Sequence, residues 1–376
     1  MSDIKILKYA LESAQGDLQS TVEAIKKNAL LIASKKVSMQ DSDIEIPYFL
    51  LRNRVEDSFN SIYSALKNVV QKSIQDLNSS EKKKTALLLG TSLVDDNLVK
   101  TVESTLYEYK KTAYSSQKRS IDSFGKDLSE ELGLNPFTMT ISTACTSSVN
   151  TLLEAKNLIE SGTFEYVVVV GVEINSDMMS SGFSSMKLLS SSSQKPFDVK
   201  RDGLVLGEGI ASVLVGRGDS QWIIKSGYSN CNSINITSVS PSGQEYVDVM
   251  QKAMQEANIE PNDITFLKAH ATSTPTNDLS EMNAIAKVFD PSLDFTALKP
   301  YTGHTLGACG ALELAILLAC LEDGFIPKTI GHEESINPDY IPLLEHKPFY
   351  GNAIFMLNYF GFGGNNTSLI MQRELS

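Results

Sequence analysis

The chain has 376 residues, of which 42% are hydrophobic and 21% charged, and its formal net charge is −12. This composition is that of a folded globular protein with two domains or two similar halves, and it excludes disordered and fibrous classes. A chain this acidic is poorly suited to bind nucleic acid or an anionic membrane surface, because both depend on clustered Lys and Arg.

The N-terminus is charged from its third residue and has no apolar core of a signal peptide. The most apolar stretch, residues 311–321, contains Glu313 and is shorter than the roughly 20 residues that span a bilayer. The four cysteines form no C-x-x-C pair and no dense disulfide framework. We therefore expect a cytoplasmic protein that does not insert into membranes.

Apolar residues recur at helical spacing over 18–31 and 55–77, with a short extended piece at 44–53 between them. The apolar run 85–91 predicts a buried strand. From about residue 137, short apolar strands alternate with helices, which predicts an α/β fold with helices covering buried sheets. The later strands are expected at 137–142, 166–172, 204–217, 264–268, 353–358 and 367–372, and the later helices at 147–159, 244–256, 279–289 and 310–321.

Cys145 lies in the segment TISTACTSS, between a predicted strand and the helix that begins near Ser147. A thiol at such a turn points at the helix N-terminus, where unpaired N–H groups and the helix dipole favour a thiolate. Its small neighbours leave space for a substrate to approach. The alternative is a buried structural cysteine, the common role of a free thiol.

Two of the four histidines stand at comparable junctions. His270 follows the predicted strand 264–268 and enters a loop of hydroxyl residues, and His304 lies between Gly303 and Gly307. The glycines Gly303, Gly307 and Gly310 allow a ligand or another backbone to approach closely. Each histidine could instead be a satisfied polar group at the end of a strand.

The segment NYFGFGGNN, residues 358–366, predicts a tight turn because three glycines alternate with two phenylalanines. A backbone N–H exposed in this turn could bind an oxyanion, and the alternative is a hairpin that serves only the topology. The segment PFDVKRDGLVLGEG, residues 196–209, is not a phosphate-binding loop, because it lacks the pattern G-x-x-x-x-G-K-[ST].

Taken together, five segments resemble the signature blocks of the β-ketoacyl-acyl carrier protein synthases, in the same order. These segments are TACTSS, PFDVKRDGLVLGEG, AHATSTPTND, LKPYTGHTLGACGALE and NYFGFGGNN. The resemblance is to the elongating, Cys-His-His class. The priming class pairs its Cys with His and Asn, and true thiolases carry a second cysteine near the C-terminus, where this chain has none.

The resemblance implies a role for each matching residue. Cys145 would be the nucleophile that carries the acyl chain, and His270 and His304 would hold the thioester carbonyl of malonyl-acyl carrier protein. Lys299 would tune the site electrostatically and pair with Glu313. The backbone N–H groups of Cys145 and Phe362 would form the oxyanion hole. The supporting residues are Phe362, which would gate the acyl pocket, Phe360, and Thr272 and Thr274, which would line the path of the phosphopantetheine arm.

The resemblance also implies the thiolase fold, a five-layered αβαβα arrangement of two similar halves. We place these halves at 1–217, with the nucleophile, and 218–376, with both histidines. The implied activity is the decarboxylative Claisen condensation of a Cys-bound acyl chain with malonyl-acyl carrier protein, in fatty-acid or polyketide/polyene elongation. The implied reaction uses no metal or cofactor apart from the phosphopantetheine of the carrier protein.

The implied partners are an acidic acyl carrier protein and a second ketosynthase subunit, in a homodimer or a heterodimer. The strand 166–172 is our candidate for pairing between subunits. Basic residues that could dock the carrier protein are Lys67, Lys72, Lys110, Lys111, Lys118, Arg119 and Arg201.

The chain departs from the family pattern at Ala271, where Gly is usual, and at Pro300, where Ser is usual. The usual glycine-rich opening strand is not recognisable in the first 80 residues. Two other functions remain open: a non-condensing subunit that resembles a chain-length factor, and a cysteine hydrolase that uses Cys145 and His270. An acyl group trapped on Cys145 would argue against the first, and release of free acid would favour the second.

Overall fold

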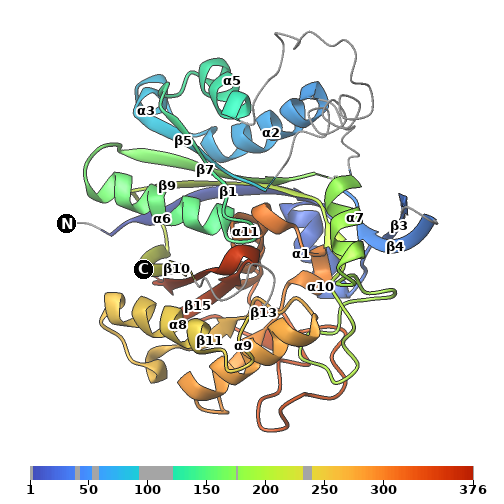
Figure 1. The fold of residues 1–376 in the computed structure, drawn as a ribbon. Helices are drawn as coiled ribbons and strands as arrows, with labels where there is room; N and C mark the ends of the chain where they lie inside the picture. Colours follow the sequence, from blue (N-terminus) through green and yellow to red (C-terminus); the bar gives the residue numbers. More distant parts are fainter. Residues whose placement is uncertain are drawn as a thin grey trace.

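The computed structural model describes residues 3–38, 43–52, 59–92, 122–174, 177–231 and 239–375. Its helices and strands stack in five layers, with helices outside, two sheets inside and further helices between the sheets (Figure 1). The helices are α1 (Leu18–Lys27), α2 (Phe59–Ile74), α3 (Ser79–Lys83), α5 (Asp122–Leu132), α6 (Ser147–Glu160), α7 (Asp177–Ser185), α8 (Gln244–Ala257), α9 (Pro275–Val288), α10 (Lys299–Thr302) and α11 (Cys309–Glu322). The strands are β1 (Lys5–Ser13), β2 (Gly16–Asp17), β3 (Ala33–Ser38), β4 (Asp43–Phe49), β5 (Thr85–Gly90), β6 (Thr138–Ile141), β7 (Tyr166–Glu173), β8 (Leu206–Gly207), β9 (Gly209–Gly216), β10 (Trp222–Cys231), β11 (Phe266–Lys268), β12 (Asp294–Thr296), β13 (Phe325–Ile326), β14 (Lys347–Pro348), β15 (Ala353–Phe360) and β16 (Asn365–Arg373).

The strand order shows two similar halves. One half runs β6-β5-β7-β9-β1 and the other β12-β11-β15-β16-β10. In each half the first three strands are parallel, and the last two pairings are antiparallel. A short pairing of Lys5 with Ile223 joins β1 to β10 and so links the halves. The predicted five-layered, two-halved fold is confirmed, whereas the exact boundary at 217/218 stays a prediction.

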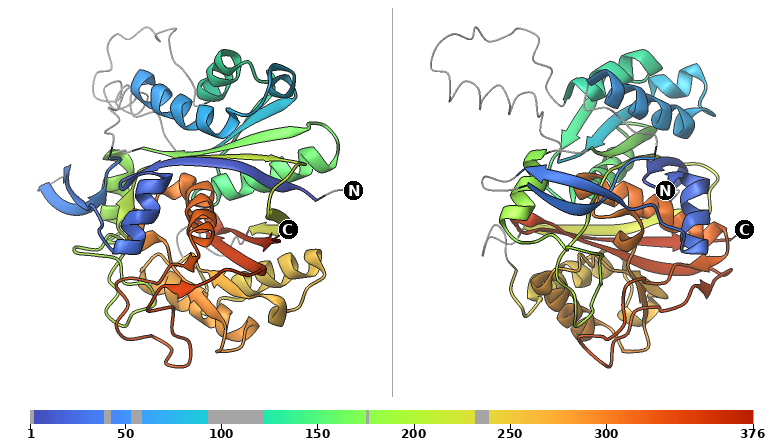
Figure 2. Two further views of the ribbon diagram at one scale, coloured as in Figure 1. Left: turned by 180° about the vertical axis from the view of Figure 1, so that it is seen from behind. Right: turned by 90° about the vertical axis from the view of Figure 1, so that its right-hand side faces the viewer.

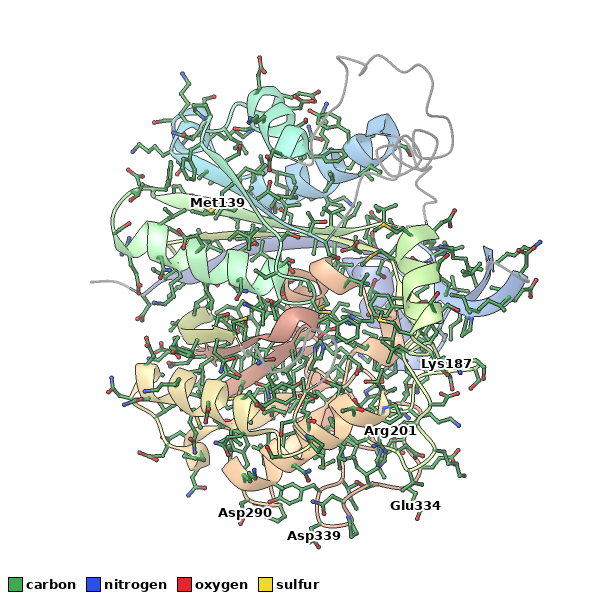
Figure 3. All side chains as sticks on the ribbon, in the orientation of Figure 1. Met139, Lys187, Arg201, Asp290, Glu334 and Asp339 are labelled. Carbon is green, nitrogen blue, oxygen red and sulfur yellow. The ribbon has the colours of Figure 1, made fainter. Side chains whose placement is uncertain are left out.

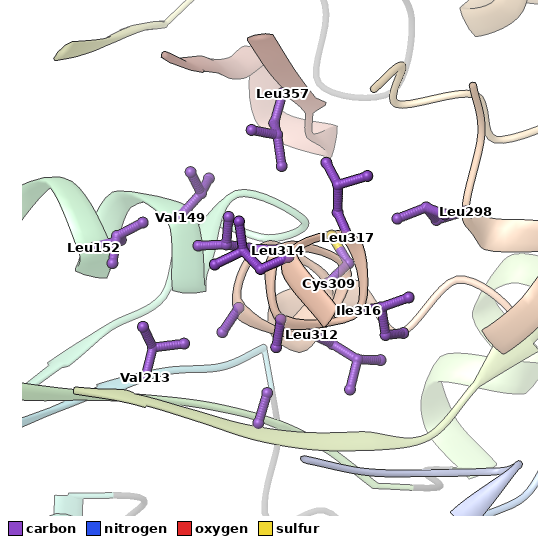
Figure 4. Packing of buried hydrophobic residues seen from close by; sticks show 14 of the residues in the cluster. Val149, Leu152, Val213, Leu298, Cys309, Leu312, Leu314, Ile316, Leu317 and Leu357 are labelled. Atoms are coloured by element: carbon purple, nitrogen blue, oxygen red, sulfur yellow. The ribbon is translucent and has the colours of Figure 1, made fainter. Parts of the chain in front are cut away.

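The layer between the sheets is built around α11. Every residue from Cys309 to Leu321 is buried, as expected for a helix that is apolar on all sides. It packs against α6 through Val149, against β9 through Val213 and against β15 through Leu357 (Figure 4). The helix therefore places its only charged buried residue, Glu313, in the centre of the molecule.

The opening strand is present, contrary to the expectation from the sequence. β1 pairs antiparallel with β9 along eight residue pairs, and the register shifts between Ile6 and Lys8. This irregularity interrupts the strict alternation of apolar residues that identifies a half-buried strand. The buried residues Ile6, Ala10 and Leu11 of β1 hold the strand in the sheet without the glycine-rich motif.

The strand 166–172 cannot pair across a subunit interface, so this prediction was wrong. β7 is hydrogen-bonded along its length to β5 on one side and β9 on the other. β6 instead forms the edge of this half and pairs only with β5 among the described strands. The residues of β6 are half-buried, and Phe137 next to it is 38% exposed.

A hairpin of β3 and β4 projects from the body and contacts α7 (Figure 2). Lys35 of β3 donates a hydrogen bond to the Ser180 hydroxyl of α7, with 2.7 Å between Nζ and Oγ. The sequence did not single out α7, and α7 carries Phe183 to the cavity described below. Within the described ranges, no helix has both the length and the apolar character to cross a bilayer.

Candidate active site

A cavity of about 270 Å³ lies where the two halves of the molecule meet. Its floor contains the predicted nucleophile and both predicted histidines, and aromatic side chains form much of its wall. The lining residues are Cys145, Phe183, Lys187, Leu188, Leu204, Val239, Tyr246, His270, Thr272, Thr274, Pro275, Thr276, Asn277, His304, Phe360, Gly361, Phe362 and Gly364. The structure therefore brings together residues from the four segments that contain the predicted site.

Cys145 stands at a tight turn between β6 and α6. Ala144 adopts a left-handed conformation with φ 53°, which is costly for a residue other than glycine. The turn is fixed by the Ser147 hydroxyl, which accepts a hydrogen bond from the Thr143 N–H at 2.9 Å and donates one to the Ala144 carbonyl at 2.7 Å. As predicted, the thiol lies at the start of a helix, and it is 5% exposed.

The expected thiolate is not the resting form of Cys145. Burial raises the pKa of its thiol to about 11, although a backbone hydrogen bond from Phe362 and the charge of Lys299 act in the opposite direction. Burial destabilises the thiolate by more than the helix N-terminus stabilises it. The sequence reveals the helix start but not the depth of burial, so the expectation was wrong on this point.

Both imidazoles face the sulfur of Cys145. His304 Nε2 lies 3.1 Å from Cys145 Sγ, and the ring centroids of His270 and His304 are 5.4 Å apart. One ligand-type atom from each of the three residues lies within 4.8 Å of the other two. A thiol with two imidazoles could also hold an ion such as Zn²⁺. The arrangement of these three side chains alone therefore does not distinguish a catalytic cluster from a metal site.

Lys299 determines which nitrogen of His270 carries the proton. Its Nζ lies 3.2 Å from His270 Nδ1 and 2.8 Å from Glu313 Oε1. The attraction of Glu313 raises the pKa of Lys299 against the opposing effect of burial. A charged ammonium can only donate, so Nδ1 accepts and the proton of His270 is on Nε2. That Nε2 is buried without a partner among the described residues, which leaves its N–H available to a ligand.

Two buried carboxylates, which the sequence did not single out, hold the loop that carries His270. Glu281 accepts hydrogen bonds from the backbone N–H groups of His270 and Ala271, both at 2.7 Å. Asp278 accepts from the N–H of Ser273 at 3.0 Å. Ala271 and Ser273 have φ values of 51° and 66°, so these bonds stabilise a strained loop. Both carboxylates lie on α9, and their position in its first two turns is the only signal in the sequence.

The glycine-rich turn after β15 approaches Cys145 closely. A Cβ on Gly361 would lie 3.4 Å from the Cys145 backbone nitrogen and 3.1 Å from the Asn365 carbonyl oxygen. The Asn365 side chain accepts hydrogen bonds from Thr146 at 2.6 Å and Asn150 at 2.8 Å. The turn is thereby tied to the start of α6, and the N–H of Phe362 is held near the sulfur.

The supporting residues predicted from the resemblance also line the cavity. Phe362 stacks on Phe183 with ring centroids 5.4 Å apart, and Phe360 stacks on Tyr246 with centroids 3.6 Å apart. The hydroxyl oxygens of Thr272 and Thr274 lie 2.9 Å apart. Neither Tyr246 nor Phe183 was foreseen: Tyr246 lies in the predicted helix 244–256, where an aromatic residue usually indicates core packing, and Phe183 lies in α7, which the sequence did not single out.

Both active-site histidines should stay neutral in mildly acidic solution. Burial lowers the pKa of His270 and of His304 well below 6.5, and the nearby charge of Lys299 adds to this effect. A histidine with the ordinary pKa would be about three quarters protonated at pH 6. NMR of protein labelled with ¹³C-histidine should show two ring signals, absent from the His270→Ala and His304→Ala variants, that keep the neutral shift at pH 6. A titration midpoint near 6.5 for either signal would contradict this.

The structure combines the thiolase fold with a Cys-His-His cluster in one cavity. The β-ketoacyl synthase N-terminal domain matches residues 53–220, and the β-ketoacyl synthase C-terminal domain matches residues 222–333. The two domain matches adjoin and together cover well over half of the chain. The chain belongs to the β-ketoacyl synthase family.

A curated relative is 3-oxoacyl-[acyl-carrier-protein] synthase 2 of Staphylococcus aureus strain COL, which is 31% identical over 252 residues. The alignment covers 61% of this chain and 60% of the relative, so the chain spans about 60% of the length of that protein. A solved structure of a ketosynthase in complex with its chain length factor, from Xenorhabdus doucetiae, gives a TM-score of 0.85 at 22% identity over 99% of this chain and 98% of that one. A type II polyketide synthase acyl-carrier protein in complex with its ketosynthase gives 0.84 at 19% identity, over 99% of this chain and 100% of that one. At these identities the two structures show the fold.

Proposed function

We propose that the chain catalyses the decarboxylative Claisen condensation of an acyl group on Cys145 with malonyl-acyl carrier protein. The observation that carries this proposal is the convergence on one cavity of a thiol, two imidazole Nε2 atoms and the N–H of Phe362. A nucleophile, donors for one oxyanion and donors for an enolate are the groups that the two halves of the reaction need.

In the first half, the sulfur of Cys145 attacks the thioester carbonyl of acyl-acyl carrier protein. The new C–S bond forms as the bond to the carrier's sulfur breaks, and the proton of Cys145 passes to that leaving sulfur. The backbone N–H groups of Cys145 and Phe362 donate to the developing oxyanion. The proposal places the proton of His304 on Nε2, which lies 3.1 Å from the sulfur, so that this N–H stabilises the negative charge that develops on sulfur during the attack.

In the second half, malonyl-acyl carrier protein loses CO₂ and its electron pair passes into the thioester carbonyl as an enolate. The Nε2–H groups of His270 and His304 donate to this oxygen. The enolate carbon attacks the acyl group, the Cys145 sulfur leaves, and it takes one proton from solvent. Atoms and charge balance without a metal or redox cofactor, and the phosphopantetheine arm belongs to the carrier protein.

The Cys-His-His-Lys set argues against the two other functions. A non-condensing subunit would not need a nucleophile beside two donors, and a hydrolase that uses Cys145 and His270 would not need His304 and Lys299. The test is to incubate the purified chain with acyl- and malonyl-acyl carrier protein and identify the products by mass spectrometry. We expect β-ketoacyl-acyl carrier protein, whereas free acid would establish a hydrolase and an unacylated Cys145 with no product would establish a non-condensing subunit.

We also propose that the carrier protein docks at the mouth of the cavity, near Arg201 and Lys187 (Figure 3). Arg201 donates a hydrogen bond to the carbonyl of Pro275, which lines the cavity, at 2.7 Å. Lys187 is exposed and lines the cavity itself, but it was not among the sequence candidates.

The other candidates offer less support for docking. Lys67 and Lys72 pair with Glu131 and Glu12 on the outer face and do not line the cavity. Lys110, Lys111, Lys118 and Arg119 lie outside the described residues.

Charge reversal at Lys187 and Arg201 should therefore weaken carrier-protein binding. Lys187→Glu and Arg201→Glu should each raise the KM for malonyl-acyl carrier protein several-fold, more strongly at low salt, because surface attraction to an acidic partner is screened by ions. The kcat should change little. Lys72→Glu is the matched control, and an equal rise in KM for this variant would contradict the docking site.

For the second subunit, we propose a dimer of like chains formed through the edge strand β6. Among the described strands β6 pairs on one side only, and Phe137 beside it is exposed; both support this choice, because an unpaired edge strand is a template for another strand. β6 leads directly to Cys145, so the interface would also stabilise the nucleophile turn. The cytoplasmic location stays a prediction from the sequence.

A further inference from the structure

A second lysine lies beneath the site, and the proposed mechanism does not use it. Lys268 ends β11, two residues before His270, and is fully buried. Its Nζ lies 2.5 Å from Glu313 Oε2 and 2.9 Å from the carbonyl oxygen of Asn358, and 3.6 Å from the centroid of the Tyr359 ring. Three groups that favour a cation thus surround the ammonium of Lys268.

Glu313 is shared between two ammonium groups. Its Oε2 accepts from Lys268, and its Oε1 accepts from Lys299 at 2.8 Å. Lys299 in turn reaches Nδ1 of His270 at 3.2 Å. A continuous series of contacts therefore runs from Lys268 through Glu313 and Lys299 to the imidazole that faces the cavity.

This sharing has two physical consequences. With one oxygen engaged by Lys268, Glu313 offers Lys299 a single contact, and the remaining N–H groups of Lys299 can reach His270. The two ammoniums and one carboxylate also carry a net charge of +1 at fully buried positions, where a charge acts strongly over a few ångströms. That charge favours an enolate in the cavity.

We propose that Lys268 is a positioning residue for the enolate-forming half of the reaction. It holds Glu313 so that Lys299 keeps its contact with His270, and it adds a buried positive charge behind both histidines. This inference rests on the proposed condensing function. Lys268 acts through Glu313 and Lys299, and it does not touch the substrate.

The proposal gives decarboxylation a specific pH dependence. The charged and titratable groups that act on Lys268 are Glu313 and Cys309 on α11, Lys299 on α10, Glu281 on α9 and the imidazoles of His270 and His304; the Tyr359 ring and the Asn358 carbonyl on β15 lie beside it. Burial lowers the pKa of Lys268 to about 8, against the attraction of Glu313. Decarboxylation should therefore decline as the pH rises through about 8, and the decline should require Lys268.

The test compares Lys268→Met with the unaltered protein in two separate assays. Decarboxylation of malonyl-acyl carrier protein should fall about 10- to 100-fold, by analogy with the loss that follows removal of a residue that orients a metal-bound histidine. Acylation of Cys145 by acyl-acyl carrier protein should change less than about threefold, since it depends on the Phe362 turn. The decline near pH 8 should be absent from the variant. Lys156→Met is the control, because Lys156 pairs with Glu160 on α6 and does not line the cavity.

Equal losses in both assays would show that Lys268 is merely structural, and unchanged decarboxylation would overturn the proposal. If the variant does not fold, the test uses the pH profile of decarboxylation by the Cys145→Gln protein, because this protein has no thiol in the cavity that could add a second pH dependence. A rate that stays constant from pH 7 to 9.5 would contradict the role of Lys268. Failure of the unaltered chain to decarboxylate malonyl-acyl carrier protein at any pH would instead contradict the proposed function.

Discussion

Replacing Cys145 with Gln should abolish formation of β-ketoacyl product while malonyl-acyl carrier protein is still converted to acetyl-acyl carrier protein and CO₂. The Gln side chain cannot accept an acyl group, so the first half of the reaction has no nucleophile. Its neutral carboxamide is similar in size to the thioester group of acylated Cys145, and its carbonyl oxygen can accept a hydrogen bond from the N–H of Phe362. The cavity next to the two histidines then resembles the cavity of the acyl-enzyme.

The measurement follows release of ¹⁴CO₂ from labelled malonyl-acyl carrier protein together with mass spectrometry of the carrier protein. Cys145→Ser serves as the comparison, because its hydroxyl retains hydrogen bonding without the carboxamide. Ketoacyl product from the Gln variant at more than about a thousandth of the original rate would exclude Cys145 as the nucleophile. If CO₂ release were lost together with the product, this result would contradict the assignment of decarboxylation to the two histidines.

Replacing His304 with Ala should remove decarboxylation and leave acylation of Cys145 measurable. Nε2 of His304 is one of the two donors proposed for the enolate oxygen, and loss of one preorganised oxyanion donor typically costs about 2.7–4 kcal/mol, or 10²–10³ in rate. Acylation keeps the Phe362 N–H and the turn at Ala144. It should slow, because His304 also lies 3.1 Å from the sulfur.

The two half-reactions are measured separately, acylation as a mass increase on Cys145 with acyl-acyl carrier protein alone and decarboxylation as CO₂ release. His332→Ala is a suitable control, because His332 bonds the Pro196 carbonyl and does not line the cavity. A His304→Ala protein that condenses at the original rate would show that the assigned role is wrong.

The sequence predicts the components of the site because each lies at a junction with a strong local pattern. Cys145 stands between a strand and a helix, and His304 lies among glycines at positions where a side chain would meet backbone. A Cβ on Gly307 would lie 2.4 Å from the Ser92 nitrogen, and one on Gly310 would lie 2.4 Å from the Val149 nitrogen. Close approach of the four segments therefore needs these glycines. The helix predicted at 310–321 is likewise present as α11, and the structure shows that it is buried on all sides.

Features that depend on tertiary contacts could not be predicted. Lys268 reads as the last residue of a short strand, and only the fold places it against Glu313, 45 positions along the chain. The carboxylates of Asp278 and Glu281 support the His270 loop from within α9, where acidic residues usually face solvent. The raised pKa of Cys145 follows from burial, which no local pattern near TACTSS reveals.

The most direct test of the central claim is a single-turnover chase with an isotopically labelled acyl group. The chain is first incubated with labelled acyl-acyl carrier protein, and peptide mass spectrometry locates the label. Unlabelled malonyl-acyl carrier protein is then added. We predict that the label leaves Cys145 and appears in β-ketoacyl-acyl carrier protein, with one CO₂ released for each label transferred. A label that never attaches to Cys145, or that leaves it only as free acid, would contradict the condensing function.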